Sequence, residues 1–308
     1  MKKFIRILLA GVLSGAAGIS LAHADGNNGG LLVGASGGPV AIAGGTLYYC
    51  SYNGGGMSSI GTAPEGRTFS SVAIAYGGPI AAAGDTLYLY GINGRAKPAG
   101  STPDGAPITS VAIAYDGPIA AAGDTLYKFV GSNRTVIGTS GDGTPFTTVA
   151  VAYFGPIAIA GDTMYQFVPR GASIQKKVLG TTGDGTPFAA LSVGTWGSYA
   201  IAGSSLYSTE HGSVELAGKA PFGKAFSSVV GTFGGAIATA GDTVYYHDRS
   251  SSELKVLAKT RDGSVFSAVD TAPTANAHPR IVLMAGRTLY QLIMRGNEGG
   301  ELTVLGSF

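Results

Sequence analysis

Four aspartates are the first candidates for chemistry in this sequence, because each stands between a glycine and a threonine in the same short phrase. They are Asp85, Asp124, Asp162 and Asp242. A ring of carboxylates at equivalent places could bind Ca²⁺ or sugars. Other copies of the phrase hold Gly45, Ser204 and Arg287 instead, so the ring is incomplete. Because Asp between Gly and Thr favours a tight turn with local hydrogen bonds, we interpret the four as turn residues.

The remaining polar candidates receive similar interpretations. A second group of aspartates precedes glycine in another recurrent turn: Asp104, Asp142, Asp184 and Asp262. Beyond residue 24 the histidines are His211, His247 and His278, which fall at unrelated places in the sequence. We expect these histidines to be surface residues. The sequence therefore assigns no catalytic residue, no metal ligand and no cofactor.

Five aromatic residues form the candidate ligand-binding site. They occur in successive copies of a repeated unit, at or next to equivalent positions after the first predicted strand: Tyr76, Tyr115, Tyr153, Trp196 and Phe233. In a ring of such units, these turns gather around one mouth of the central channel. Aromatic faces there could stack against sugar rings, whereas the alternative is packing between units. The alternation of large and small residues in the preceding strand favours packing, and binding is the hypothesis to test.

The element that positions these residues is a repeat of about 40 residues. The segment 72–88 returns almost unchanged at 111–127 and at 149–165, and fainter copies precede and follow these three. A tyrosine closes each of seven copies, at spacings of 38 to 45 residues: Tyr48, Tyr88, Tyr127, Tyr165, Tyr207, Tyr245 and Tyr290. Together with 51 Gly, 14 Pro and 15 Tyr, this period predicts an all-β, seven-bladed β-propeller.

The third unit shows how one blade is predicted to form. Its four antiparallel strands are expected at 111–115, 118–123, 125–130 and 135–139, separated by turns rich in Gly and Asp. We predict that each blade is continuous in sequence and that the first blade packs on the last to close the ring. Six large apolar residues, each just before the start of a unit, are assigned to the core: Phe69, Ile108, Phe146, Phe188, Phe226 and Phe266. Cys50, the only cysteine, is expected to be buried.

At this level residues 33–308 resemble the β-propeller superfamily. The phrase at 117–127, Gly-Pro-Ile-Ala-Ala-Ala-Gly-Asp-Thr-Leu-Tyr, is similar to a hairpin found in several propeller groups, including tectonin-type lectins. Those lectin repeats usually carry a Trp in each blade, whereas this sequence has Trp196 alone. The segment 140–146 is similar to the Asp-box of sialidase-type propellers, which is a structural turn. That resemblance implies no enzyme activity.

Residues 1–24 have the three parts of a secretory signal peptide, with a basic start, an apolar run from Ile7 to Leu21 and small residues before the expected cleavage after Ala24. A flexible leader is expected at 25–32 and the propeller at 33–308. Three of the 20 basic residues and none of the 18 acidic ones lie in the signal, which leaves 17 basic against 18 acidic residues. This balance gives no charge pattern for nucleic acid, and no membrane span is expected after cleavage.

The loops between third and fourth strands vary most between the units. They hold much of the charge, including Glu210 with His211 and Asp248 with Arg249. Loops on a rigid scaffold commonly carry binding residues, but neutral sequence change at exposed positions produces the same variability. We favour neutral change as the explanation and assign no site to these loops.

Together these features predict an exported, non-enzymatic binding protein in the periplasm or outside the cell, with a glycan or a protein as ligand. One alternative is a propeller enzyme that acts on polysaccharide, as a glycosidase or a lyase. Another is a structural component of an envelope assembly. Close carboxylates in a pocket would favour the enzyme, an uncharged aromatic pocket would favour lectin-like binding, and a large exposed apolar patch would favour assembly. The sequence indicates neither the ligand's identity nor the oligomeric state.

Overall fold

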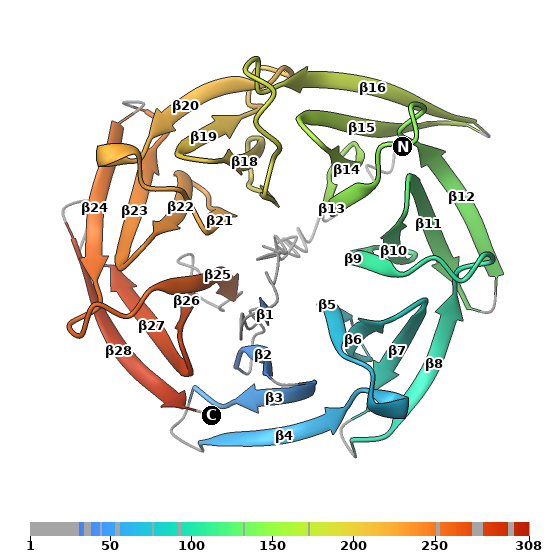
Figure 1. Cartoon of the computed structure of the whole chain (residues 1–308), viewed down its shortest axis with the longest axis horizontal. Coiled ribbons are helices and arrows are strands. Elements are labelled where there is room, and N and C mark those ends of the chain that lie inside the picture. The colour runs from blue at the N-terminus through green and yellow to red at the C-terminus, as the bar shows by residue number, and fades with distance from the viewer. Residues whose placement is uncertain are drawn as a thin grey trace, which may run out of the picture.

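The chain folds into seven antiparallel sheets that stand around one axis like the blades of a propeller (Figure 1). The computed structural model describes residues 31–33, 38–43, 45–52, 56–75, 77–91, 94–131, 133–171, 173–250, 253–272, 280–294 and 299–307. In this part of the chain each sheet contains four strands in sequence order, so every blade is continuous. The predicted seven-bladed, all-β fold is confirmed.

The four strands of each blade run outward from the axis in chain order. The first strands are β1 (Leu31–Val33), β5 (Phe69–Ala75), β9 (Ile108–Ala114), β13 (Phe146–Ala152), β17 (Ala190–Val193), β21 (Ser228–Gly231) and β25 (Phe266–Ala272). The second strands are β2 (Val40–Ala43), β6 (Gly78–Ala83), β10 (Gly117–Ala122), β14 (Gly155–Ala160), β18 (Ser198–Ala202), β22 (Gly235–Ala240) and β26 (Arg280–Ala285). The third strands are β3 (Thr46–Cys50), β7 (Thr86–Tyr90), β11 (Thr125–Val130), β15 (Thr163–Arg170), β19 (Ser205–Ser208), β23 (Thr243–Asp248) and β27 (Thr288–Met294). The fourth strands are β4 (Met57–Thr62), β8 (Ala96–Ser101), β12 (Asn133–Thr139), β16 (Ser173–Thr181), β20 (Glu215–Lys219), β24 (Glu253–Lys259) and β28 (Gly300–Ser307).

The antiparallel order gives the propeller two distinct faces. In every blade the turn from the first to the second strand and the loop from the third to the fourth strand lie at the same end of the sheet. We call this end the aromatic face, because the candidate aromatic residues follow the first strands in sequence. The turns from the second to the third strand and the crossovers to the next blade form the crossover face. Two crossovers contain short 3₁₀ turns, η1 (Pro64–Gly66) and η2 (Pro221–Gly223).

A large apolar residue at the start of a blade joins that blade to the preceding one. The Phe146 N–H donates to the Gly123 carbonyl of the preceding blade at 2.7 Å, while the Phe146 ring packs edge-on against Tyr165 of its own blade. The same ring contact recurs in the pairs Phe188–Tyr207, Phe226–Tyr245 and Phe266–Tyr290. All six residues assigned to the core at this position are buried, which confirms the prediction. Burial of one such side chain contributes about 1.5–3 kcal/mol.

Close approach between blades also explains a glycine near the end of the fourth strand. A Cβ added to Gly138 would lie 2.5 Å from Cε1 of Phe167 in the next blade, which is too close for two carbon atoms. In the same way, a Cβ added to Gly100 would lie 2.4 Å from Cδ1 of Phe129. An aromatic ring on one third strand therefore fills the space that a side chain on the preceding fourth strand would need.

Buried serines add hydrogen bonds between the innermost strands. In three places a serine hydroxyl accepts a hydrogen bond from the N–H of a valine in the next blade. The pairs, with their oxygen–nitrogen distances, are Ser71–Val111 (3.0 Å), Ser110–Val149 (2.9 Å) and Ser228–Val269 (3.1 Å). Because these N–H groups are removed from water, leaving one unpaired would be costly. The recurrent Ser-Val dipeptide is a signal that the sequence interpretation did not use.

The ring closes by packing of the first blade against the last, as predicted. Cys50 of blade 1 lies in one buried cluster with Val282 and Met284 of blade 7. Across the same seam the Arg280 guanidinium lies over the Tyr52 ring, 4.3 Å from its centroid. Cys50 is fully buried, as expected, and desolvation raises the pKa of its thiol. The described residues contain no strand shared between the two ends of the chain.

The N-terminal predictions concern residues that are mostly outside the described part of the chain. The signal peptide at 1–24 lies wholly outside it, as does the leader up to residue 30. Strand β1 begins at Leu31, two residues before the predicted start of the propeller at residue 33. None of the described residues form a helix with the length and hydropathy needed to traverse a bilayer.

Alanine substitution of the fourth-strand glycine tests the contact between blades. We expect Gly138→Ala to lower the free energy of unfolding by about 1–3 kcal/mol, because the new methyl group displaces the Phe167 ring. Gly218 occupies the same position in blade 5, where an added Cβ would lie 3.8 Å from the Leu254 Cβ, an ordinary contact. Gly218→Ala should therefore leave stability unchanged or raise it. Chemical denaturation of both variants checks this, and equal losses would contradict it.

Candidate functional site

Four of the five candidate aromatic residues are exposed at the aromatic face. Their exposed fractions are 108% for Tyr115, 95% for Tyr153, 53% for Trp196 and 67% for Phe233. Tyr76 lies outside the described residues. The favoured interpretation, packing between blades, is therefore wrong for the other four. Strand β9, for example, ends at Ala114, so the next residue lies in the turn and no longer follows the alternation of the strand.

The structure joins exposed aromatic side chains in two pairs. Trp196 of blade 5 and Phe233 of blade 6 have ring centroids 6.1 Å apart, at an interplanar angle of 63°. In blade 4, Tyr153 contacts the exposed Phe154 at 5.0 Å, a residue that the sequence interpretation did not include. No ring contact within the described residues links Tyr115 to either pair. Of these two pairs, only Trp196 and Phe233 join the aromatic residues of neighbouring blades.

Glycines allow the backbone around Trp196 to come close to its neighbours. A Cβ on Gly197 would lie 2.9 Å from the Glu210 Cα, and a Cβ on Gly231 would lie 2.6 Å from the Gly194 Cα. The approach of Gly231 to Gly194 joins blades 5 and 6 backbone to backbone, whereas the approach of Gly197 to Glu210 lies within blade 5. The glycine at 194, where blades 3 and 4 have alanine, therefore has a steric reason. This close contact places the Trp196 ring at the junction of the two blades.

A row of polar contacts holds the Trp196 side chain in place. The Arg249 guanidinium lies over the Trp196 ring, 5.0 Å from its centroid. The Arg249 Nε donates to one carboxylate oxygen of Glu210, and the other oxygen accepts a hydrogen bond from the Tyr199 hydroxyl. The Glu210 side chain is only 9% exposed, so this ion pair is shielded from water on the carboxylate side. Burial and the Glu210 carboxylate raise the pKa of Tyr199 well above its ordinary value.

These polar groups occupy positions that hold apolar residues in other blades. Tyr199 of β18 stands where blade 3 has Ile119, and His247 of β23 stands where blade 3 has Phe129. At the position of His247 and Phe129, blade 5 has Thr209. Blades 5 and 6 have therefore exchanged part of the apolar packing between blades for a polar cluster. A comparison of these positions along the repeat was the signal that could have located the cluster from sequence.

His247 is buried, which corrects the expectation of surface histidines. Its side chain is 4% exposed, and neither ring nitrogen makes a hydrogen bond of normal geometry with the described residues. Burial lowers the pKa of His247, whereas the carboxylates of Glu210 and Asp248 act in the opposite direction. His211 is exposed, as expected, and His278 lies outside the described residues. The imidazole fills the volume that the Phe129 ring fills at the equivalent position of blade 3.

The recurrent aspartates are turn residues, as predicted, and they belong to the crossover face, away from the aromatic site. Asp124 accepts a hydrogen bond from the Thr125 hydroxyl at 2.9 Å, and the three equivalent aspartates do the same with their own threonines. In the second group, Asp142 accepts from the Thr144 N–H at 2.9 Å. Within the described ranges no three His, Cys, Asp or Glu side chains lie together as a metal site would require.

Comparisons with known proteins support the fold. No family model and no curated protein matches the chain. Among solved structures, PorZ, described as an essential bacterial surface component of the type IX secretion system of Porphyromonas gingivalis, has a TM-score of 0.59 at 12% identity, over 93% of this chain and 39% of PorZ. The extracellular domain of the putative hybrid two-component system BT4673 from B. thetaiotaomicron has a TM-score of 0.61 at 11% identity, over 94% of this chain and 47% of the other.

The WD40 propeller domain of Doa1 is similar to a comparable degree, with a TM-score of 0.60 at 13% identity, over 85% of this chain and 90% of the domain. The chain spans less than half the length of the PorZ and BT4673 chains. At these identities the similarity shows the β-propeller fold alone.

Replacing His247 by Phe, the residue of blade 3, tests how the buried imidazole responds to acid. The unfolded chain binds a proton here near pH 6.5, whereas burial holds the folded pKa lower. Above that pH this group therefore does not reduce the free energy of unfolding. As the pH falls further, protonation of the unfolded chain lowers that free energy by at most about 1.4 kcal/mol per pH unit until the folded pKa is reached. Glu210 and Asp248 reduce the size of this loss. His247→Phe should abolish it, and parallel pH profiles of thermal unfolding for the two proteins would contradict the assignment.

Proposed function

We propose that the protein is a non-enzymatic carbohydrate-binding module whose ligand binds the aromatic face at the junction of blades 5 and 6. The observation that carries this proposal is the exposure of four aromatic side chains at turns, where polar residues are usual. Aromatic rings stack against the apolar faces of sugars and keep this ability at a partly hydrated surface. Charged groups beside them can form strong hydrogen bonds with sugar hydroxyls.

Trp196 is the proposed centre of the site because contacts within the protein hold its ring in place. Arg249 lies over the ring, Glu210 binds Arg249, and Tyr199 binds Glu210. Phe233 contacts the ring from the next blade. An aromatic platform that is already ordered loses little conformational entropy on binding. The Arg249 side chain is partly exposed, so it is also available to a ligand that lies against Trp196.

The enzyme alternative has less support at this site. Glycosidases commonly use two carboxylates that flank the scissile bond. Among the described residues the cluster contains one buried carboxylate, Glu210, and its two oxygens already bind Tyr199 and Arg249. A tyrosine that served as the base of a lyase would need a lowered pKa, whereas that of Tyr199 is raised. Binding is therefore the function that the geometry favours.

The proposal includes export to the periplasm or to the medium. It is supported by the basic, apolar and small-residue segments of residues 1–24, which follow the order of a secretory signal. Two structural neighbours agree with such a location, since one is described as a bacterial surface component and the other as an extracellular domain. The activities of those longer proteins are not carried over to this chain.

Trp196 is the only tryptophan, so its fluorescence reports on the proposed site alone. Titration with cell-wall or capsular oligosaccharides should shift or quench this emission. Calorimetric titration of Trp196→Ala should show binding weakened at least about tenfold, as expected for loss of an aromatic anchor. The thermal midpoint should change by no more than about 3 °C, because the lost ring was half exposed.

Phe222→Ala is the matched control, because Phe222 is an exposed aromatic residue on the opposite, crossover face. This variant should keep the wild-type affinity for the oligosaccharide. Binding without any change in emission would place the ligand elsewhere. Unfolding of Trp196→Ala would show that the indole is part of the core.

Mass spectrometry of the protein recovered from the envelope or the medium tests export. The mature chain should begin at Asp25, because the small Ala24 precedes the expected cleavage site. Ala24→Leu should accumulate the uncut precursor, since signal cleavage needs a small residue at that position. Recovery of a wild-type chain that still contains Met1 would rule the processing out.

A further inference from the structure

The turns of the aromatic face are held in one place by a glycine at the start of the second strand. A Cβ on Gly117 would overlap the Phe129 carbonyl oxygen of the third strand, and a Cβ on Gly155 would overlap that of Phe167. The same contact recurs at Gly235 in blade 6. Only glycine fits so close to a backbone, so these turns share one position relative to their blades. The two residues before this glycine are exposed, and we call them the first and second turn positions.

Aromatic residues occupy these turn positions in four successive blades. The first position holds Tyr115, Tyr153 and Phe233 in blades 3, 4 and 6, and the second holds Phe154 and Trp196 in blades 4 and 5. Phe154 therefore stands where Trp196 stands in the next blade. Each of these two rings is exposed and contacts a second exposed ring, which is Tyr153 for Phe154 and Phe233 for Trp196. Blade 4 thus carries a second aromatic pair like the one at the proposed site.

The two aromatic pairs lie on adjacent turns of the same face. Strands β13 and β17, which lead into the turns of blades 4 and 5, contact each other, and both turns follow at the same end of the sheets. Thr195 holds the first turn position of blade 5, which comes between Phe154 and Trp196 in the order of positions. Its side chain is small and exposed, and its hydroxyl can form hydrogen bonds with a ligand. A ligand on Trp196 can therefore continue over Thr195 to Phe154.

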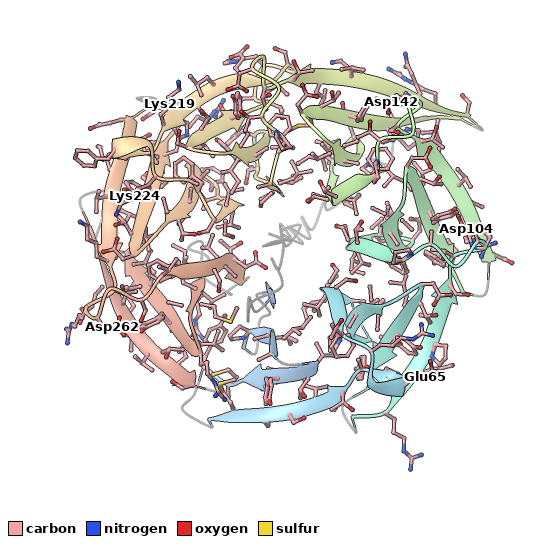
Figure 2. The ribbon with its side chains drawn as sticks, viewed as in Figure 1. Glu65, Asp104, Asp142, Lys219, Lys224 and Asp262 are labelled. Atoms are coloured by element: carbon pink, nitrogen blue, oxygen red, sulfur yellow. The ribbon has the colours of Figure 1, made fainter. Side chains whose placement is uncertain are left out.

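The turns of the opposite face have a different character. In six crossovers the central turn residue is acidic in five, four of which are labelled in Figure 2: Glu65, Asp104, Asp142, Asp184 and Asp262. In the sixth crossover this residue is Phe222, which is exposed. Exposed rings gain nothing from the hydrophobic effect within their own chain. The row of aromatic residues on the aromatic face is therefore not explained by folding.

The charges beside the row do not favour an anionic ligand. At the turn positions of blades 3 to 6 the charged residue is Asp116, which forms an ion pair with Lys128. The loops from third to fourth strands in these blades, with the strand ends beside them, carry more acidic than basic residues. The basic ones are Arg170 and Arg249, and the acidic ones are Glu210, Glu215, Asp248 and Glu253. A polyanion would be repelled by this excess of carboxylates, so an uncharged ligand fits the row better.

We propose that the aromatic face binds an uncharged linear polysaccharide along its length, with the Trp196–Phe233 pair and the Tyr153–Phe154 pair on successive segments of one chain. This inference rests on the proposed function, to which it adds the class of ligand and a second subsite. Rings at equivalent turns of a repeated scaffold suit a ligand that is itself a repeat, and each ring can stack on the apolar face of one sugar. Tyr115 extends the row by one blade.

Affinity as a function of chain length tests the proposal. Trp196 emission first identifies the polymer that binds, from a panel of soluble glucans, xylans, mannans and galactans together with the polyanion polygalacturonate. Oligosaccharides of that polymer with about 2 to about 12 sugars are then titrated by calorimetry. Affinity should rise at least about tenfold once a chain reaches both pairs, because the second subsite then binds at a high effective concentration. Reduction of the terminal sugar to an alditol should leave the affinity of the longest chain unchanged.

Phe154→Ala tests the second subsite. This variant should bind the longest oligosaccharide at least about tenfold more weakly and the shortest one, which reaches Trp196 alone, as the wild type does. Its thermal midpoint should change by no more than about 3 °C, because the Phe154 ring is 67% exposed. Phe154→Tyr keeps the ring and should keep the affinity. Phe222→Ala, on the opposite face, should change neither affinity.

The outcomes separate this inference from the function on which it rests. If no polymer of the panel changes Trp196 emission, the proposed function fails and this inference fails with it. If a polymer does change the emission but chains of all lengths bind equally, the function stands and binding along the chain is wrong. Full affinity of Phe154→Ala for the longest chain would likewise remove the second subsite, and a preference for polygalacturonate would refute the uncharged class.

Discussion

Crowding around the axis is the constraint on which the rest of this structure depends. The first strands of neighbouring blades contact each other all the way round the ring. Sheets can approach this closely only if the inner positions are small on one side, which is why buried alanines such as Ala112 and Ala120 recur beside larger residues. The buried serines then supply partners for N–H groups that water cannot reach. Farther out, where the blades diverge, rings such as Phe146 and Phe167 fill the widening space.

The departures from this repeated packing are concentrated where blade 5 meets blade 6. On the aromatic face, glycines allow the backbones of the two blades to come into contact, and the exposed Trp196 ring lies against Arg249. Inside the junction a polar cluster replaces apolar side chains. On the crossover face, Phe222 replaces the usual carboxylate. A repeat scaffold conserves its packing in most blades and can specialise one junction, because each blade depends only on its two neighbours.

The repeat made the fold predictable from sequence. Seven tyrosines at a regular spacing, and turns with the same chemistry in each unit, indicated strand number, blade order and continuity without any knowledge of long-range contacts. The site was less predictable. Trp196 was found because it interrupts the repeat, but exposure of Tyr115 depended on where strand β9 ends, a boundary displaced by one residue. The contact between Glu210 and Arg249 joins loops of two blades, and no property of a single repeat specifies that distance.

The seam between blades 7 and 1 has a consequence for how such a chain can change over time. Its contacts are between side chains and backbone of complete blades, as in the cluster around Cys50, and no described strand crosses it. Duplication or deletion of one coding unit therefore changes the size of the ring by one whole blade without rethreading either terminus. The near identity of residues 72–88, 111–127 and 149–165 is the trace that such copying leaves. At the junction of blades 5 and 6, Trp196, Tyr199 and His247 differ from the residues of that common unit, so one junction can change its side chains while the copied scaffold is kept.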